Sequence, residues 1–199
     1  MKTLKTLTSE KLPTNINNIK NIILDLDETL INSIIPGELL YSNKGNIFKK
    51  KEKLFTHHMM DVDFIVVERP HLQTFLDFIF KNYNVSVWTA ASKSYALFII
   101  ENILLKSNKK RKLDYILYDS HCNYSKHNTN CIKQLEQLFH LPNYNRRNTL
   151  IIDDNDEVSE GNQSIDNKII HIKKFSFFNN DSENDTELLQ IKNFLETKN

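Results

Sequence analysis

Short apolar segments of strand type alternate with segments of helical periodicity along most of the chain, and this alternation constrains the possible folds more than any other feature. The strand-like runs begin near Asn21, Asn84, Leu113, Leu150 and Ile169. Strands separated by helices of about 10 to 15 residues form βαβ units and a mainly parallel sheet. The sequence therefore predicts an α/β fold.

Helices are expected where apolar residues recur at positions i, i+3, i+4 and i+7. The expected helices start at Pro70 and cover residues 92 to 106, 131 to 139 and 186 to 197. Pro70 fits the first helical position, where the N–H group that proline lacks would have no partner within the helix. These helices alternate with the expected strands, as a layered α/β fold requires.

Residues 31 to 66 interrupt this alternation directly after the first strand. The segment contains Pro36-Gly37, a further turn-forming stretch and many lysines, so we expect loops and a small β-hairpin rather than a large cap domain. Residues 1 to 18 are polar and are expected to form a flexible segment, which leaves residues 19 to 199 as one domain. The predicted architecture is a three-layer sandwich with a hairpin insert after its first strand.

Polar side chains follow three of the expected strands. Asp25 and Asp27 follow the first strand, Thr89 follows the second, and Asp153 and Asp154 follow the strand that begins at Leu150. Ligands of open parallel sheets bind outside the carboxyl ends of the strands. We therefore expect these side chains to meet at one edge of the sheet and to form the functional site.

This group of carboxylates suits phosphoryl transfer to an aspartate. Asp25 would attack phosphorus, and Asp27 would protonate the leaving oxygen and later activate the water that hydrolyses the aspartyl-phosphate. Several carboxylates in one site require a counter-charge, and Mg²⁺ prefers oxygen ligands. The ion would be held by Asp25, by the main-chain carbonyl of Asp27, and by Asp153 or Asp154.

The phosphate oxygens need donors of their own. The hydroxyl group of Thr89 and the ammonium group of a lysine would supply them, and both Lys133 and Lys126 are candidates for that lysine. The chain has only three glycines: Gly37, Gly45 and Gly161. Neither a GxGxxG fingerprint nor a phosphate-binding P-loop can be built from them, and all three fall in expected loops away from the proposed site. Phosphate would therefore be held by side chains, Mg²⁺ and main-chain N–H groups after Asp25.

The sequence resembles the haloacid dehalogenase (HAD) superfamily and, within it, the CTD-phosphatase-like group (FCP/SCP, NLI-interacting-factor-like). The matching stretches run in order through residues 20 to 197: NIILDLDETLINS, VERPHLQTFLDFIFKNYNVSVWTAAS, CIKQLEQL, LIIDDND, DNKIIHI and DTELLQIKNFL. The combination of DLDET with RP-x5-L and WTAAS indicates this group. The resemblance implies a HAD-like Rossmannoid fold, with Asp25 as nucleophile, Asp27 as acid and base, and Thr89 as a phosphate ligand.

The resemblance also bears on the choice of lysine and on the substrate. Lys133, in Lys133-Gln-Leu, stands where the family shows Lys-Asp-Leu, so it is the implied phosphate-binding lysine, with Lys126 as the alternative. The group consists of Mg²⁺-dependent phosphoric monoester hydrolases. Its members typically act on phosphoserine or phosphothreonine in proteins, notably in the C-terminal repeats of RNA polymerase II.

Alternative functions remain open at this point. One is a HAD phosphatase that acts on a small molecule or a nucleic-acid end, and another is a catalytically weak scaffold that binds phosphoproteins. A phospho-receiver domain would place its acidic pair after the first strand and a lone acceptor aspartate in mid-chain, which is the reverse of the order in this sequence. The residue order therefore argues against a receiver.

Charge and cysteine content indicate the cellular setting. The net charge of +1 gives no general attraction to nucleic acid, so direct nucleic-acid binding is not expected. No secretory signal and no segment that could span a membrane are visible, and Cys122 and Cys131 form no disulfide framework. We expect an intracellular protein, cytoplasmic or nuclear, with the basic run Lys109 to Lys112 as a weak nuclear localisation motif.

Overall fold

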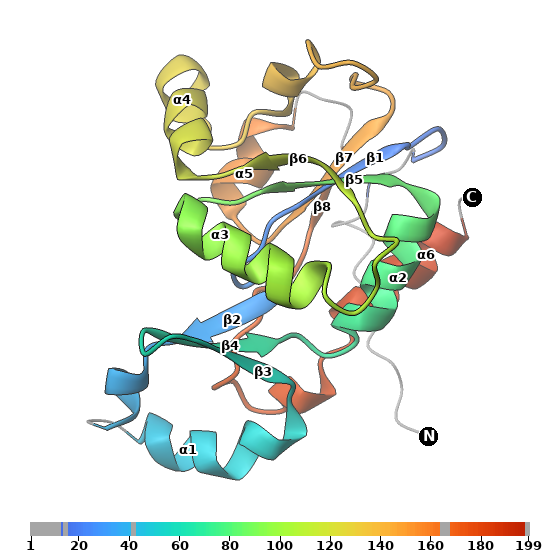
Figure 1. The fold of residues 1–199 in the computed structure, drawn as a ribbon. Helices are drawn as coiled ribbons and strands as arrows, with labels where there is room; N and C mark the ends of the chain where they lie inside the picture. Colours follow the sequence, from blue (N-terminus) through green and yellow to red (C-terminus); the bar gives the residue numbers. More distant parts are fainter. Residues whose placement is uncertain (1–12, 14–15, 41–42, 164–167, 198–199) are drawn as a thin grey trace.

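The computed structural model describes residues 13, 16 to 40, 43 to 163 and 168 to 197 (Figure 1). Most of the N-terminal segment that is expected to be flexible lies outside these residues. Its described residue Ile16 is buried and packs in the main core, so this end of the segment contributes to the folded structure. Among the described residues, none of the helices combines the length and the apolar character that crossing a membrane requires.

The larger sheet has five parallel strands in the order β6-β5-β1-β7-β8. These strands are β1 (Asn21–Leu24), β5 (Asn84–Trp88), β6 (Leu113–Leu117), β7 (Thr149–Asp153) and β8 (Ile169–His171). The first strand lies at the centre, where Asn21 is opposite Asn84 on one side and Thr149 on the other. All five strands coincide with predicted ones, and the prediction of a mainly parallel sheet is confirmed.

Helices cover both faces of this sheet and make the three layers. One face carries α2 (Leu72–Asn82), α3 (Lys93–Ile99) and α6 (Glu187–Glu196), and the other carries α4 (Asp119–Thr129) and α5 (Asp156–Gly161). A hydrophobic core lies between the sheet and the helices on each face. Ile22 and Leu24 of β1 pack in the core under α2, α3 and α6, and Ile23 packs in the core under α4 and α5. Successive strand residues point to opposite faces, so a fully apolar strand suits a sheet that is covered on both sides.

A second sheet of three antiparallel strands is inserted after β1. Its order is β2-β4-β3, and the insert contains β2 (Ile31–Ile34), α1 (Lys44–Lys51), β3 (His57–Met60) and β4 (Phe64–Glu68). The expected hairpin is present as β3 and β4, whereas the sequence predicts neither α1 nor the strand β2. None of the residues of α1 is buried, so its sequence carries no helical hydrophobic pattern.

The prediction of a helix at residues 131 to 139 is wrong. Only Leu135–Leu138 forms a short 3-10 helix, and the regular helix α4 lies earlier, at Asp119–Thr129. This helix is polar, and only Cys122 and Ser125 of it are buried, which leaves little periodicity for a sequence pattern to detect. The residues around Lys133 therefore form a turn.

Two other helices differ in detail from the prediction. Helix α2 starts at Leu72 rather than at Pro70, because His71 adopts a left-handed conformation with φ of 66° that cannot belong to a right-handed helix. The helix expected at 92 to 106 starts after Ser92, whose side chain accepts a hydrogen bond from the N–H of Tyr95. It then continues beyond α3 as a π-helix over Ile100–Leu104.

Candidate active site

Asp25 directly follows β1 and begins a tightly held turn. The N–H groups of Leu30 and Ile31 both bond to the carbonyl of Leu26, and the N–H of Glu28 bonds to the carbonyl of Ile31. Glu28 has φ of 59°, a left-handed conformation that reverses the chain. The buried side chain of Arg69 also donates a hydrogen bond to the carbonyl of Thr29 in this turn.

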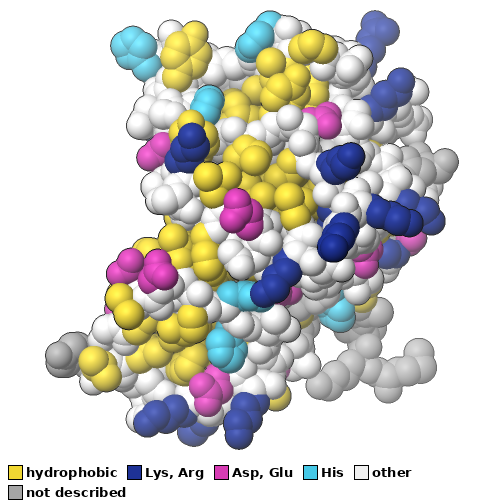
Figure 2. Space-filling view, in the orientation of Figure 1, with side chains coloured by type: hydrophobic (Ala, Val, Ile, Leu, Met, Phe, Trp, Pro, Cys, Tyr) yellow, Lys and Arg dark blue, Asp and Glu magenta, His cyan; other side chains and the backbone are white. Residues whose placement is uncertain are grey.

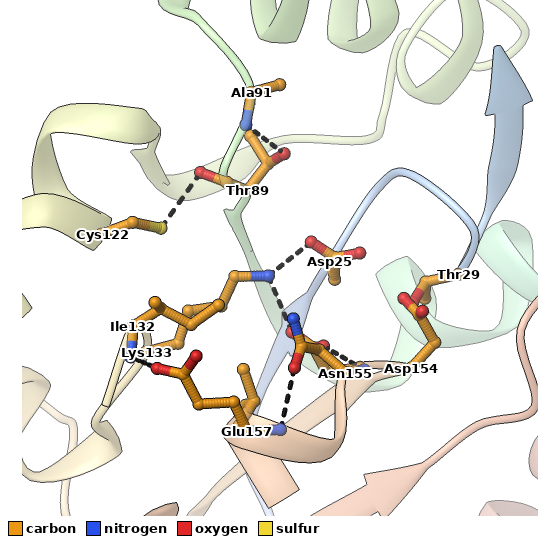
Figure 3. Close-up of polar contacts among 12 residues, drawn as sticks. Asp25, Thr29, Thr89, Ala91, Cys122, Ile132, Lys133, Asp154, Asn155 and Glu157 are labelled. Carbon is orange, nitrogen blue, oxygen red and sulfur yellow. Dashed lines mark hydrogen bonds and ion pairs between the residues drawn. The ribbon is translucent and has the colours of Figure 1, made fainter. Parts of the chain in front are cut away.

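Three carboxylates meet at the carboxyl ends of β1 and β7. Asp25, Asp153 and Asp154 each offer an oxygen, and these oxygens lie within 4.8 Å of one another (Figure 3). The Nζ of Lys133 lies 2.5 Å from Asp25 Oδ1 and 2.7 Å from Asp153 Oδ2. Asp154 accepts a hydrogen bond of 2.9 Å from the hydroxyl of Thr29. The structure thus brings together four of the residues that the sequence singled out.

Burial dominates the electrostatics of this cluster. It raises the pKa of Asp25 to about 6, although the nearby ammonium of Lys133 opposes the shift. Burial likewise raises the pKa of Asp153 and of Asp154. For Lys133, burial lowers the pKa, but Asp25 and Asp153 outweigh it and raise the pKa above its ordinary value. Lys133 is buried among the three carboxylates, whereas Lys174 is largely exposed and lies 3.9 Å from Asp154. The buried groups therefore carry an excess of negative charge, which a cation would offset.

Lys133 lies in a turn that side chains from α4 and α5 hold in place. The hydroxyl of Ser125 donates to the carbonyl of Cys131 and accepts from the N–H of Gln134. The side chain of Asn162 donates to the carbonyl of Lys133 and accepts from the N–H of Leu135, each at 2.8 Å. These bonds replace the helical hydrogen bonds that the sequence pattern predicted. Lys133 is only 2% exposed as a result.

The alternative lysine, Lys126, lies outside the carboxylate cluster. Its side chain is more than half exposed and forms an ion pair with Glu157.

Gly161 is closer to the site than expected, since a Cβ atom there would lie 2.5 Å from the sulfur of Cys131. The absence of a side chain at Gly161 lets α5 pack against the turn that carries Lys133.

We expect Asn162→Ala to lower the free energy of unfolding by about 2–3 kcal/mol, because it leaves buried main-chain groups of Lys133 and Leu135 without partners. Urea denaturation measures the change. The matched control is Asn128→Ala, which removes an exposed asparagine that bonds to its own helix, and it is expected to cost less than about 0.5 kcal/mol. Equal effects of the two variants would contradict this role of Asn162.

Asp27 and Thr89 lie beside the cluster rather than in it. The side chain of Asp27 accepts a hydrogen bond of 2.6 Å from the hydroxyl of Tyr95, and burial raises the pKa of Asp27 to about 6. The hydroxyl of Thr89 accepts a bond from the N–H of Ala91. Sequence analysis missed Tyr95 as a site residue. The helical spacing of α3 placed it on the apolar face, and nothing in the pattern showed that its hydroxyl reaches Asp27.

Cys122 also lies near the site, where its thiol donates to the carbonyl of Thr89 (Figure 3). Burial raises the pKa of Cys122 to about 11. The thiolate is the nucleophilic form of cysteine, and it forms only as the pH rises toward the pKa. Cys122 is therefore protonated at neutral pH and is poorly suited to be a nucleophile.

The expected result is that iodoacetamide at pH 8 alkylates Cys122 in the folded protein about a hundredfold more slowly than in urea, because the unfolded thiol has a pKa near 8.5. Peptide mass spectrometry measures both rates, and the folded rate should rise with pH well beyond pH 9. Cys122→Ala should retain the activity of the wild type. A loss of activity as complete as that expected for an essential nucleophile would contradict this assignment.

The basic run that was interpreted as a nuclear localisation motif is only partly accessible. Arg111 is buried, donates to the carbonyl of Leu104 and forms an ion pair with Asp77. On the face shown in Figure 2, Lys and Arg side chains are spread out with Asp and Glu among them. The structure thus gives Arg111 a role in packing.

The donor set of the carboxylate cluster fits a hard divalent cation. Asp25, Asp153 and Asp154 offer only oxygen atoms, all of them partly or fully buried, and among the described residues no histidine or cysteine belongs to the cluster. Oxygen-only sites favour Mg²⁺ or Ca²⁺ over zinc, which takes nitrogen and sulfur ligands. These residues therefore suit the kind of metal that the sequence predicted.

Comparison with known sequences gives a consistent set of relatives. The sequence model of the family described as NLI interacting factor-like phosphatase matches residues 20 to 199. The CTD phosphatase-like protein 355R of Invertebrate iridescent virus 6 is 42% identical over 183 residues, which are 89% of this chain and 97% of that protein. The CTD small phosphatase-like protein 3 of Caenorhabditis elegans is 30% identical over 88% of this chain, which spans about half of that relative (53%).

Solved structures with the same fold are more distant in sequence. The fission yeast RNA polymerase II CTD phosphatase Fcp1, bound to beryllium fluoride, superposes with a TM-score of 0.55 at 19% identity. The match covers 91% of this chain and 52% of Fcp1. A HAD family enzyme of Bacteroides thetaiotaomicron, in complex with magnesium and inorganic phosphate, gives a TM-score of 0.52 at 14% identity and covers 79% of this chain and 96% of that enzyme.

Proposed function

Because the chain belongs to the family of NLI interacting factor-like phosphatases and is a phosphoric monoester hydrolase with the HAD fold, we propose that it dephosphorylates phosphoserine or phosphothreonine in proteins through an aspartyl-phosphate. The observation that supports this proposal is the convergence of Asp25, Asp153 and Asp154 around the ammonium group of Lys133. A strand-end carboxylate with a fixed cationic partner is what a phosphoryl-accepting nucleophile needs.

In the first step, a carboxylate oxygen of Asp25 attacks phosphorus and the bond from phosphorus to the substrate oxygen breaks. Asp27, in its protonated form, gives its proton to that leaving oxygen, so that an alcohol departs rather than an alkoxide. Lys133 and Thr89 hold the non-bridging oxygens of the phosphoryl group. Because Lys133 already contacts Asp25, it can stabilise the negative charge where the new bond forms.

In the second step, water attacks the phosphorus of the aspartyl-phosphate and the bond to Asp25 breaks. Asp27 is now a carboxylate and takes a proton from the water, which returns both aspartates to their starting states. Inorganic phosphate is released. The sequence of steps consumes one water molecule and releases one alcohol and one phosphate.

We propose that Mg²⁺ occupies the carboxylate cluster. Asp25, the main-chain carbonyl of Asp27, and Asp153 or Asp154 would hold it, and when bound it neutralises part of the charge on the carboxylates and the phosphoryl group. The bond from Thr29 to Asp154 orients one of these ligands, in the way that hydrogen bonds around metal ligands commonly do.

The shape of the insert supports a protein substrate. The described part of the insert is a small sheet with one α-helix and two short 3-10 helices. Its large exposed hydrophobic side chains are Ile35, Leu40, Leu54, Met59 and Val62. Apolar side chains gather over this part of the molecule in Figure 2. Exposed patches of apolar side chains are typical of protein recognition. The names of the relatives make the repeats of the RNA polymerase II C-terminal domain the first candidate.

Removal of divalent metal tests the catalytic part of this proposal. We expect EDTA to lower the hydrolysis of an aryl phosphate at least about a hundredfold and Mg²⁺ to restore it. Mg²⁺ should also raise the melting temperature of the wild type but not that of Asp154→Asn, since binding to the folded state stabilises it. Full activity in EDTA would contradict the metal-dependent mechanism.

A panel of substrates tests the proposed substrate class. The panel contains phosphorylated Ser-Pro heptad peptides, unrelated phosphoserine peptides, small sugar phosphates and 5′-phosphorylated oligonucleotides. We expect the highest kcat/KM for phosphopeptides. A preference for sugar phosphates or oligonucleotides would favour the alternative phosphatase function, and binding of phosphopeptides without turnover would favour a scaffold.

We also propose that residues 19 to 199 act as one phosphatase domain, because one main core, which begins at Ile16, includes Ile19 near its start and Leu195 near its end. A cytoplasmic or nuclear location remains a prediction. Imaging of the tagged protein, with and without substitution of the exposed lysines at positions 109, 110 and 112, tests whether the basic run directs it to the nucleus.

A further inference from the structure

Tyr95 connects the insert to the turn that follows the nucleophile. Its hydroxyl donates a hydrogen bond of 2.6 Å to Oδ1 of Asp27 and also contacts the hydroxyl of Ser33 in β2. A tyrosine has only one hydroxyl hydrogen, which Asp27 receives, so Ser33 must be the donor in the second contact. The bonds therefore run from Ser33 to Tyr95 and from Tyr95 to Asp27.

The ring of Tyr95 is held in position by packing. Tyr95 is buried, and the ring of Phe64 in β4 packs edge-on against it, with 5.5 Å between the ring centroids and 80° between the planes. The N–H of Tyr95 bonds to Ser92 at the start of α3. A hydroxyl on a ring fixed at both ends can impose an orientation on the carboxyl group that it contacts.

The bond from Tyr95 gives the two carboxylate oxygens of Asp27 different surroundings. Oδ1 is taken by the tyrosine, and among the residues that the structure describes Tyr95 is the only side chain that hydrogen-bonds to this carboxyl group. Oδ2 is therefore the oxygen that can carry a proton toward a leaving group. Proton transfer in a transition state depends on such alignment, and small misplacements are costly.

We propose that Tyr95 is a positioning residue that orients Asp27 for proton transfer to the leaving oxygen. This inference rests on the proposed function, because it requires Asp27 to be the general acid. Tyr95 acts through Asp27. The cost of removing its hydroxyl should therefore depend on how much the leaving group needs a proton.

The test compares Tyr95→Phe with the wild type on two substrates. A phosphoserine peptide releases a poor leaving group that needs a proton, whereas p-nitrophenyl phosphate releases a phenolate that departs without one. The quantity to compare is kcat/KM, because it reports the steps up to departure of the leaving group and excludes hydrolysis of the aspartyl-phosphate. We expect a loss of about ten- to a hundredfold for the phosphoserine peptide and of less than about threefold for the aryl phosphate.

Two further variants keep the result decisive. Tyr144→Phe removes another buried tyrosine hydroxyl, which bonds to Ser86 rather than to Asp27. This variant should change kcat/KM by the same factor for both substrates. In an Asp27→Asn background, Tyr95→Phe should cause no further loss, because the residue through which it acts is already disabled. If Tyr95→Phe does not fold, Ser33→Ala should replace it in the test. Its loss of kcat/KM should again be larger for the phosphoserine peptide than for the aryl phosphate, but smaller than the loss expected for Tyr95→Phe.

The inference fails if Tyr95→Phe lowers kcat/KM equally for both substrates, if neither value changes, or if the losses add in the Asp27→Asn background. These outcomes differ from failure of the proposed function. The proposed function fails if Asp25→Asn keeps its activity, whatever Tyr95→Phe does.

Discussion

Replacement of Asp25 by asparagine is expected to lower kcat/KM for an aryl phosphate by about 10⁴-fold or more, because an amide oxygen cannot form the aspartyl-phosphate. The variant should still fold, since asparagine has the same shape and Asp153 still pairs with Lys133. Circular dichroism and the melting temperature check the fold. Enzyme kinetics with the wild type at the same Mg²⁺ concentration measure the loss.

The phosphoenzyme gives a second measurement of the same variant. Rapid quenching in acid should trap a wild-type species that is heavier by one phosphoryl group and sensitive to hydroxylamine, and this species should be absent from Asp25→Asn. The matched control is Asp63→Asn, which makes the same chemical change at an exposed turn of the insert and should leave the rate unchanged. An Asp25→Asn protein that retains a tenth of the wild-type rate would contradict the mechanism.

Replacement of Arg69 by methionine is expected to lower the free energy of unfolding by about 3–5 kcal/mol, because it leaves the partners of a buried cation unpaired. Arg69 is 1% exposed and binds Asp185 through Nε and Nη2, at 3.0 and 2.9 Å. It also donates to the carbonyls of Thr29 and Lys173. Urea denaturation followed by fluorescence measures the change in stability.

A surface ion pair provides the matched control for Arg69. Arg146→Met removes an arginine that is about half exposed and pairs with Glu136, and it should cost less than about 1 kcal/mol. The double variant Arg69→Met with Asp185→Asn should recover part of the lost stability, since no charged carboxylate is then left unpaired. A loss for Arg69→Met no larger than that of the surface control would contradict its role.

The meeting of Asp25, Asp153 and Asp154 could be predicted from the sequence, whereas their chemical roles remain predictions. Each follows an apolar strand, and parallel strands place their carboxyl ends at one edge of a sheet. The strand signals are strong because β1 and β7 are buried on both faces. Each strand therefore contains a continuous run of apolar residues, which is easy to recognise in the sequence.

The surroundings of Lys133 and Tyr95 could not be predicted in the same way. The turn around Lys133 depends on Ser125 and Asn162, whose partners are main-chain groups distant in sequence, and local periodicity carries no information about them. The spacing of apolar residues in α3 suits a buried position for Tyr95, and the side chain is buried. Its contact with Asp27 depends on how α3 and the insert pack together, which is a tertiary property.

The central place of β1 in the sheet has a consequence for synthesis of the protein. Asn21 and its partner Thr149 in β7 are 128 positions apart, so at about 5–20 residues per second a ribosome needs on the order of ten seconds to make both. During that interval the nascent chain contains Asp25 but lacks Asp153, and it gains Lys133 only near the end. If the proposed mechanism holds, catalysis cannot begin until Asp153 has been translated. Until then the apolar residues of β1 lack their β7 partners, and a chaperone could bind them.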